Sequence, residues 1–486
     1  MDNLKSKGIK AFIWDMGGKL SIQGMGFIIT IILARLLEPS DFGLIAMIMV
    51  VIGIAQVFTD VGLGGALIQR RKLLPIHYSS VFYFNILIAT CLTLITYFSA
   101  DLIATFYDNR ELTPLTQSVS FLFIISALSS VQAIRLRKQL NYTLLTKVSF
   151  ISSLLSGVIG VLLAVNGAGV WSLMVQVILQ GIFYNLIIWN YSEWKPSLAF
   201  SFKALKQLWK FGFRMFLSEV LDAVFTRLDF LIIGKVFSAS TLGHFQLAKQ
   251  FNSLVIKYSS GSLMAVMFPL LSQVQKDLPR FRNIILKSLN ILCFVVFLLL
   301  GCLYLTAEEL IIFLFTDKWL PSVEYMQILI LSGFGIPISS LLVNVLSSRG
   351  NSKAFLKLEI LKKSLHVFNF INAYYNGIEI YLYGLVGVTI FSVSLNIIFA
   401  KTELKMSAFG FFKPIVIQML IGVIATIATY QINDFLTTSM LLGFLIKSTF
   451  FIFLFLLINI ILRTESFNEV RNQVYPILKN KLRFKC

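Results

Sequence analysis

Charged side chains interrupt several of the long apolar stretches in this sequence of 486 residues. An ionised side chain in such a stretch is costly to bury unless it pairs with an opposite charge, faces water or binds a ligand. These lysines can bind an anionic group, or they can neutralise carboxylates of the same chain, and the sequence leaves both interpretations open. The four that we single out are Lys19, Lys249, Lys257 and Lys362.

Carboxylates in stretches of the same kind are candidate counter-charges, or candidate ligands for a coupling cation. They are Asp15, Asp60, Glu219, Asp222 and Asp229. Spacings of three and seven residues put Glu219, Asp222 and Asp229 on one face of a helix. Asp15 can belong either to a cavity or to the entry of the first helix.

Counting outward from the turn between two helices matches residues by depth. One turn lies near residue 39 and another near residue 240. Opposite charges at equal distances from a turn can meet across the two helices that it joins. The matched pairs are Lys19 with Asp60, Asp222 with Lys257, and Asp229 with Lys249.

The most polar of the predicted helices carries a stripe of charge. Glu359, Lys362, Lys363 and His366 follow the spacing i, i+3, i+4, i+7 and share one face. Such a face is unlike one that contacts lipid, so we expect the stripe to line a watery vestibule.

Two further cations receive a different interpretation. Arg227 falls on the same predicted helix as Glu219 and projects from another face of it. Lys447 stands alone among apolar residues and is expected to snorkel toward the membrane surface.

The elements that must position these residues follow from composition. Hydrophobic residues make up 57% of the chain and charged residues 13%, whereas soluble proteins carry roughly 25% charge. Apolar runs of about 20 residues are typical of transmembrane helices, and the alternation over ~10 residues that marks a membrane β-barrel is missing. The sequence therefore predicts an all-α polytopic membrane protein with fourteen transmembrane helices. These are 12–37, 41–66, 77–99, 113–134, 143–165, 168–190, 209–237, 241–268, 283–306, 322–347, 353–376, 378–400, 410–432 and 439–462.

Loop charges give the orientation of these helices. Basic residues concentrate in alternate loops, such as those holding Arg70 and Lys276, while the intervening loops are richer in acids such as Glu38 and Asp101. This positive-inside pattern predicts that both termini lie in the cytoplasm. It also attributes the net charge of +19 to membrane topology rather than to nucleic-acid binding.

The chain reads as two similar halves. ILARLLEPSDFGLIAM (residues 32–47) aligns without a gap with IIGKVFSASTLGHFQL (residues 232–247), at an offset of 200. Two further pairs of similar stretches follow in the same order, so helices one to six repeat as helices seven to twelve. Because six spans is an even number, the copies share one orientation, with a two-fold axis along the membrane normal and a central cavity. The predicted domains are an N-lobe over 1–200, a C-lobe over 201–405, and two extra helices with a cytoplasmic tail over 406–486.

Such an architecture is typical of a transporter that rocks two bundles, not of an enzyme. The sequence holds no HExxH, no GxGxxG after a strand, no Walker loop and no paired cysteines. We therefore predict no catalytic residue, no metal site and no cofactor. The three histidines, His77, His244 and His366, are expected to be packed or interfacial.

Several stretches resemble one family in their joint order. They are ARLLEPSDFGLIAM, FTDVGLGGALIQRRK, TRLDFLIIGKVFSASTLGHFQLA, MFPLLSQVQKDLPRFR and the DKWLPS loop. Together they are similar to the bacterial polysaccharide repeat-unit flippases (Wzx type), in the polysaccharide transport group of the multidrug/oligosaccharidyl-lipid/polysaccharide (MOP) superfamily. The likeness spans roughly residues 10 to 400, and the last two helices carry little of it.

The resemblance implies a function. It implies alternating-access export of an undecaprenyl-pyrophosphate-linked oligosaccharide across the bacterial inner membrane, for capsule, exopolysaccharide or O-antigen synthesis. The partners would be the lipid-linked oligosaccharide, membrane lipids and other polysaccharide-assembly proteins, with H⁺ or Na⁺ as a coupling ion. The four lysines would then face the pyrophosphate, and the acids would hold those lysines or bind the coupling cation.

Two rivals make different predictions. A multidrug or cation antiporter of the same superfamily predicts a cavity dominated by acids, whereas the charges inside the predicted helices lean basic. A membrane-embedded glycosyltransferase predicts a large extracytoplasmic loop with catalytic side chains. The longest such loop is about residues 307–321, which disfavours that class.

Overall fold

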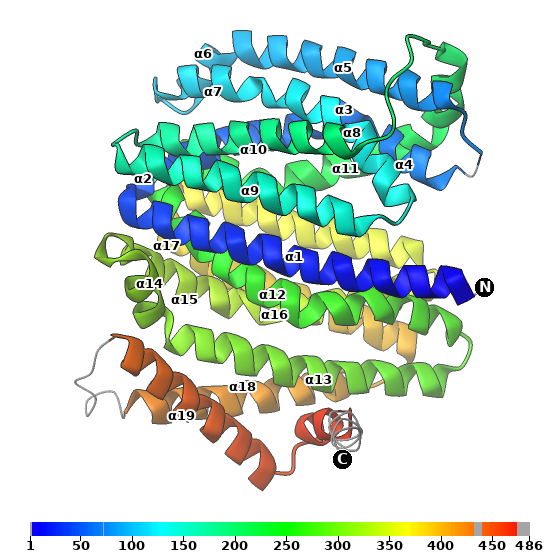
Figure 1. The fold of residues 1–486 in the computed structure, drawn as a ribbon. Coiled ribbons are helices and arrows are strands. Elements are labelled where there is room, and N and C mark those ends of the chain that lie inside the picture. Colours follow the sequence, from blue (N-terminus) through cyan, green and yellow to red (C-terminus); the bar gives the residue numbers. More distant parts are fainter. Residues whose placement is uncertain (1, 71, 432–439, 474–486) are drawn as a thin grey trace, which may run out of the picture. The chain divides into compact units, whose positions relative to one another are not determined.

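The computed structural model describes residues 2–70, 72–431 and 440–473, and every regular element among them is helical (Figure 1). The chain divides into two compact units, Met1–Gln246 and Leu247–Cys486. The predicted lobes over 1–200 and 201–405 rest on the sequence repeat and remain a prediction.

Among its described residues, the first unit contains eleven complete α-helices and the start of a twelfth. They are α1 (Asp2–Leu36), α2 (Pro39–Ala55), α3 (Val57–Asp60), α4 (Leu63–Gln69), α5 (Pro75–Phe98), α6 (Ala100–Phe106), α7 (Leu112–Ser120), α8 (Leu122–Lys138), α9 (Tyr142–Val165), α10 (Val170–Tyr191) and α11 (Phe202–Val236). Helix α12 (Ala239–Gln273) begins in this unit and ends in the second.

The second unit continues with longer helices. They are α13 (Leu278–Leu305), α14 (Ala307–Phe315), the 3₁₀ turn η1 (Asp317–Trp319), α15 (Pro321–Gly333), α16 (Gly335–Ser348), α17 (Ser352–Leu404), α18 (Ala408–Tyr430) and α19 (Met440–Ile461). Helix α17 contains a break at Gly377, whose φ is 90°, where the sequence predicts the turn between two helices.

Eleven helical segments of the described residues are long and apolar enough to cross a membrane. The predicted spans 209–237, 241–268 and 353–376 are not among them, although they fall in α11, α12 and the first half of α17. The charged residues in these three segments lower their mean hydropathy. The chain is thus a multi-pass helical membrane protein, and the count of fourteen spans remains a prediction.

The predicted continuous helix over 41–66 is wrong near its end. Val61 and Gly62 have φ values of 46° and 69°, in the left-handed region that an L side chain adopts only at a cost. The break separates α3 from α4 and directly follows Asp60. It therefore places a carboxylate at the start of a new helix.

The two turns that share the offset of 200 touch each other within the first unit. A Cβ atom on Gly43 would lie 1.7 Å from the carbonyl oxygen of Ala239, and one on Gly243 would lie 1.9 Å from that of Pro39. Pro39 and Ala239 are themselves 200 residues apart, so the contact is reciprocal, as in an isologous interface between two copies. Each backbone approaches so closely because glycine has no Cβ.

The first half of α17 has an exposed apolar face and a half-buried charged face. Leu356, Ile360 and Phe368 are 60%, 57% and 71% exposed, while Glu359 and Lys362 are half-buried. A helix in water shows the opposite arrangement. The apolar face is suited to lipid, which agrees with the expectation that the charged stripe turns away from it.

Candidate functional site

Helix α11 runs antiparallel along α2, α3 and α4, with glycine at the close contacts. A Cβ on Gly62 would lie 2.1 Å from the carbonyl oxygen of Gly212, and one on Gly53 would lie 2.1 Å from Cζ of Arg227. An edge-to-face contact between Phe58 and Phe216, with ring centroids 5.1 Å apart, adds to the packing near the Asp60 break. These contacts fix α11 against the broken second helix.

Arg227 occupies the space that Gly53 leaves open. Its Nη1 donates a hydrogen bond of 3.2 Å to the carbonyl oxygen of Met49, and its side chain is half-buried. A guanidinium group has five N–H donors in a rigid fork that suits carboxylate or phosphate oxygens. Arg227 has no role in the sequence-based prediction, because its contact with Gly53 depends on how two helices far apart in the chain pack together.

Asp60 is held at the helix break by uncharged donors. Both of its carboxylate oxygens accept from the backbone N–H of Gly64 at 3.0 Å. The side-chain amide of Asn85 lies 3.4 Å from Oδ1 of Asp60 and 3.3 Å from Oγ of Ser130. This carboxylate caps the first turn of α4, as anionic groups do at helix N-termini.

The packing of α11 determines how exposed its acidic side chains are. Glu219 is exposed and lies within electrostatic range of Asp60. Asp222 is also exposed, whereas Asp229 is half-buried. The structure therefore brings Asp60 and Glu219 together, a pair of like charges that depth matching did not predict.

The remaining predicted residues are more scattered. Lys19 is exposed on α1, and the side chain of Asp15 lies outside the described part of that helix. Lys249 is half-buried and Lys257 is exposed on α12, in the second unit. Because Asp222 and Asp229 belong to the first unit, their pairing with these lysines remains a prediction.

Lys362 forms an ion pair with Glu359 on the same helix, and their side chains are 13% and 29% exposed. This arrangement agrees with the interpretation in which the in-membrane charges neutralise one another. Lys362 can meet an anionic ligand only by sharing its charge with Glu359.

The expectation that Lys447 snorkels is wrong. Its ammonium group on α19 forms an ion pair with Glu309 of α14, and each side chain is only 10% exposed. The snorkelling rule applies to a lone cation, and the sequence alone does not show that a carboxylate 138 residues away lies within reach. The pair links α19 to α14.

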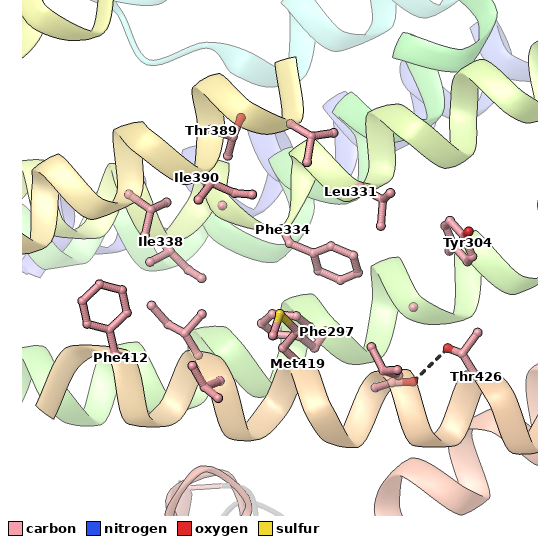
Figure 2. A pocket seen from close by; sticks show the side chains of 18 of the residues that line it. Phe297, Tyr304, Leu331, Phe334, Ile338, Thr389, Ile390, Phe412, Met419 and Thr426 are labelled. Carbon is pink, nitrogen blue, oxygen red and sulfur yellow. Dashed lines mark hydrogen bonds between the residues drawn. The ribbon is translucent and has the colours of Figure 1, made fainter. Parts of the chain in front are cut away.

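An apolar groove lies among α13, α15, α16, α17 and α18 (Figure 2). Its volume is about 710 Å³, within the range of ligand pockets. The rings of Phe297 and Phe334 stack in its wall with centroids 4.6 Å apart. The hydroxyl of Thr426 donates to the carbonyl oxygen of Gly422 (2.8 Å; Figure 2), so its donor is already engaged. The groove suits a hydrocarbon ligand.

Comparisons with known proteins agree on one group. The profile of the polysaccharide biosynthesis protein family matches residues 32–324. Teichuronic acid biosynthesis protein TuaB of Bacillus subtilis (strain 168) is 25% identical over 422 residues, which are 85% of this chain and 87% of that protein. Succinoglycan biosynthesis transport protein ExoT of Rhizobium meliloti (strain 1021) is 27% identical over 321 residues, 66% of this chain and 65% of that one.

A solved structure extends the likeness to the fold. Lipid II flippase MurJ in its inward closed conformation matches with a TM-score of 0.72 over 93% of this chain and 100% of that chain. The two sequences are 16% identical, so this match describes the fold alone.

Proposed function

Because the chain belongs to the polysaccharide biosynthesis protein family, we propose that it is a flippase for a lipid-linked oligosaccharide. It exports an undecaprenyl-pyrophosphate-linked repeat unit across the bacterial inner membrane, for capsule, exopolysaccharide or O-antigen synthesis. Both termini lie in the cytoplasm, and fourteen spans form two six-helix lobes and an added pair.

One observation carries this proposal. The chain holds a half-buried guanidinium group, that of Arg227, and also a large apolar groove. A lipid-linked sugar needs both environments, since its pyrophosphate requires cations and its polyprenyl tail requires hydrocarbon. A transporter of small polar solutes has no use for the groove.

The pyrophosphate binds to cations that face the transport path. Arg227 provides a fork of donors, and Lys19, Lys249, Lys257 and Lys362 add positive potential to the same path. Asp15, Asp60, Glu219, Asp222 and Asp229 hold these cations when no substrate is present, or bind a coupling H⁺ or Na⁺. The sugar requires hydrogen-bonding side chains and water along this path.

The tail occupies the groove of the second unit. Helix α18 forms one of its walls, and α19 lies behind α13, since a Cβ on Gly301 would lie 2.6 Å from the ring of Phe451. Helix α18 therefore gives the tail a protein surface, while the head group takes the polar path. The head group thus avoids hydrocarbon throughout transport.

The reciprocal contact between Gly43 and Gly243 supports alternating access. Two equivalent turns that meet at glycine touch through backbone contacts that can separate and re-form. The lobes then open to each side of the membrane in turn.

The membrane potential assists export. Moving one charge is worth ~2.3 kcal/mol per 100 mV, so two negative charges leaving a negative-inside cell gain roughly 5 kcal/mol at 100 mV. No ATP-binding loop is present in the sequence, which agrees with a potential-assisted mechanism.

Reconstituted vesicles test this proposal. The purified chain is placed in proteoliposomes with a fluorescent polyprenyl-pyrophosphate oligosaccharide, and its appearance on the opposite face is followed under an imposed potential. We expect transport that accelerates when the side of departure is negative. A rate that ignores the potential would refute the electrical contribution, and absence of any transport would refute the function.

A cation antiporter is the second candidate, and the exposure of Glu219 and Asp222 on one face of α11 favours it. It predicts that the same vesicles exchange organic cations for protons or Na⁺. Uptake of a cationic dye, with no movement of the lipid-linked sugar, would select this alternative.

A further inference from the structure

The segment between α10 and α11 exposes large apolar side chains outside any membrane-spanning helix. Leu198 is 99% exposed and Phe200 42%, while Phe202 in the first turn of α11 is 77% exposed. The rings of Phe200 and Phe202 meet edge to face with centroids 4.8 Å apart. Clustered apolar groups of this kind indicate a surface that another molecule covers.

Hydrogen bonds hold this segment in place. The backbone N–H of Ser197 donates to Oγ of Ser79 at 3.1 Å, and that of Ser201 donates to Oγ of Ser80 at 2.9 Å. Trp194 anchors the start of the segment, buried among aromatic rings of the first unit. The exposure of Leu198 is therefore a fixed property of the fold.

The two serines also set the depth of the segment. They lie four and five residues into α5, a candidate membrane span over Pro75–Phe98, or about 6 to 8 Å along its axis at 1.5 Å per residue. A span of 24 residues is about 36 Å long, longer than the roughly 30 Å hydrocarbon core. The excess is about 6 Å, so the two serines lie at or just inside the boundary between head groups and acyl chains, and so does the segment.

Basic residues surround the apolar cluster. Within residues 192–210 the only acid is Glu193. The exposed lysines are Lys195, Lys203, Lys206 and Lys210. Aromatic side chains among lysines at this depth are typical of segments that lie in the interface of an anionic membrane.

We infer that residues 195–210 form an interfacial anchor that binds anionic phospholipid head groups of the cytoplasmic leaflet. Leu198, Phe200 and Phe202 insert at the boundary between head groups and acyl chains, and the lysines contact the phosphates. The anchor fixes the start of α11, the helix that carries Arg227. The inference requires that α5 spans a membrane and begins on its cytoplasmic side, and it is independent of the transported substrate.

Lipid-dependent stability tests the charged part of the anchor. The full chain is placed in nanodiscs of phosphatidylcholine, with and without phosphatidylglycerol, and its thermal midpoint is measured. We expect the anionic lipid to raise the midpoint, and the variant K195Q/K203Q/K206Q to lose about half of that rise, because several lysines near the surface share the attraction. The matched control K147Q/K276Q/K401Q removes as many exposed lysines elsewhere and should keep most of it. Equal losses in the two variants would overturn the inference.

Spin labels test the apolar part. Labels are attached at Leu198→Cys, Phe200→Cys and Lys195→Cys in a background without the four native cysteines, and their collision with oxygen and with a water-soluble nickel chelate is compared. We expect positions 198 and 200 to favour oxygen, and position 195 to favour the chelate. A label at position 198 that collides with the chelate as freely as position 195 would place the segment in water and refute insertion. The stability experiment uses native cysteines and stands even if the background fails to fold.

Discussion

The two compact units hold their in-membrane charges in different ways. In the second unit, two of these cations are neutralised by carboxylates: Lys447 by Glu309 and Lys362 by Glu359. In the first unit, the Met49 carbonyl bonds Arg227, and a backbone N–H with a side-chain amide holds Asp60.

The difference shows where an outside ion can act. A cation that already faces a carboxylate has its charge cancelled locally, and an anionic ligand must displace that partner. A cation that faces a carbonyl keeps its formal charge, and its field extends into the surrounding path. We therefore expect Arg227 of the first unit to contribute more to head-group binding than Lys362 of the second unit, whose charge is shared with Glu359.

Breaking the buried pair of the second unit gives the largest expected effect. We expect Lys447→Met to destabilise the protein by about 3 to 5 kcal/mol, because it leaves the Glu309 carboxylate buried without a counter-charge. The measurement is the thermal midpoint in detergent. The double variant K447M/E309Q should recover most of the loss. If the single and double variants have the same thermal midpoint, the unpaired Glu309 carboxylate does not destabilise the protein.

Removing the charge of Arg227 tests the first unit. We expect Arg227→Gln to slow transport by about 10- to 100-fold, the value of one or two charge-assisted hydrogen bonds, while the thermal midpoint changes little. Arg227→Lys should keep part of the activity, and Arg110→Gln, in an exposed loop, serves as the matched control. Wild-type transport by Arg227→Gln would remove the guanidinium from the head-group path.

Filling the groove tests whether the second unit holds the lipid tail. We expect Met419→Trp to reduce transport of the full lipid-linked substrate by roughly tenfold, since overpacking and lost tail contacts each cost about 1 to 3 kcal/mol. Binding of a short, water-soluble sugar pyrophosphate should be unaffected, whereas Arg227→Gln should weaken it. If Met419→Trp also weakens binding of the soluble sugar pyrophosphate, the head group and the tail do not bind at separate sites.

The smallest effect is expected at the break after Asp60. Asp60→Asn retains an acceptor for the N–H of Gly64, so the thermal midpoint should fall by less than that of Asp60→Ala, which loses the cap and about 0.5 to 2 kcal/mol. Circular dichroism melts of the two variants check this order. An equal loss with Asn and with Ala would indicate that the negative charge itself, and not the hydrogen-bond acceptor, is required.

The sequence predicted the class of fold because hydropathy needs no knowledge of packing. Eleven of the predicted spans meet the test of length and composition. The predicted spans in α11, α12 and the first half of α17 do not meet that test, because helices that carry charge lose the apolar signal that marks a span, and they remain predictions. The turns at Pro39 and Gly377 could be predicted from the sequence, because proline and glycine interrupt a helix locally.

The site was less predictable. Hydropathy predicts a continuous helix over 41–66 and does not reveal the left-handed residues Val61 and Gly62, which break that helix directly after Asp60. Arg227 was discounted because the space over Gly53 exists only after two distant helices pack. Lys447 was misassigned because its partner, Glu309, stands in a separate helix.

The contact of Gly43 with Ala239 and of Gly243 with Pro39 has an evolutionary consequence. Under the predicted duplication, a self-pairing surface would present one residue twice, so an enlarged side chain would clash at both of its contacts. A later substitution that enlarges the side chain in one turn is tolerated only if the other turn changes to make room for it. The two turns are therefore expected to change in concert across distant lineages, even where the helices that flank them have diverged beyond alignment.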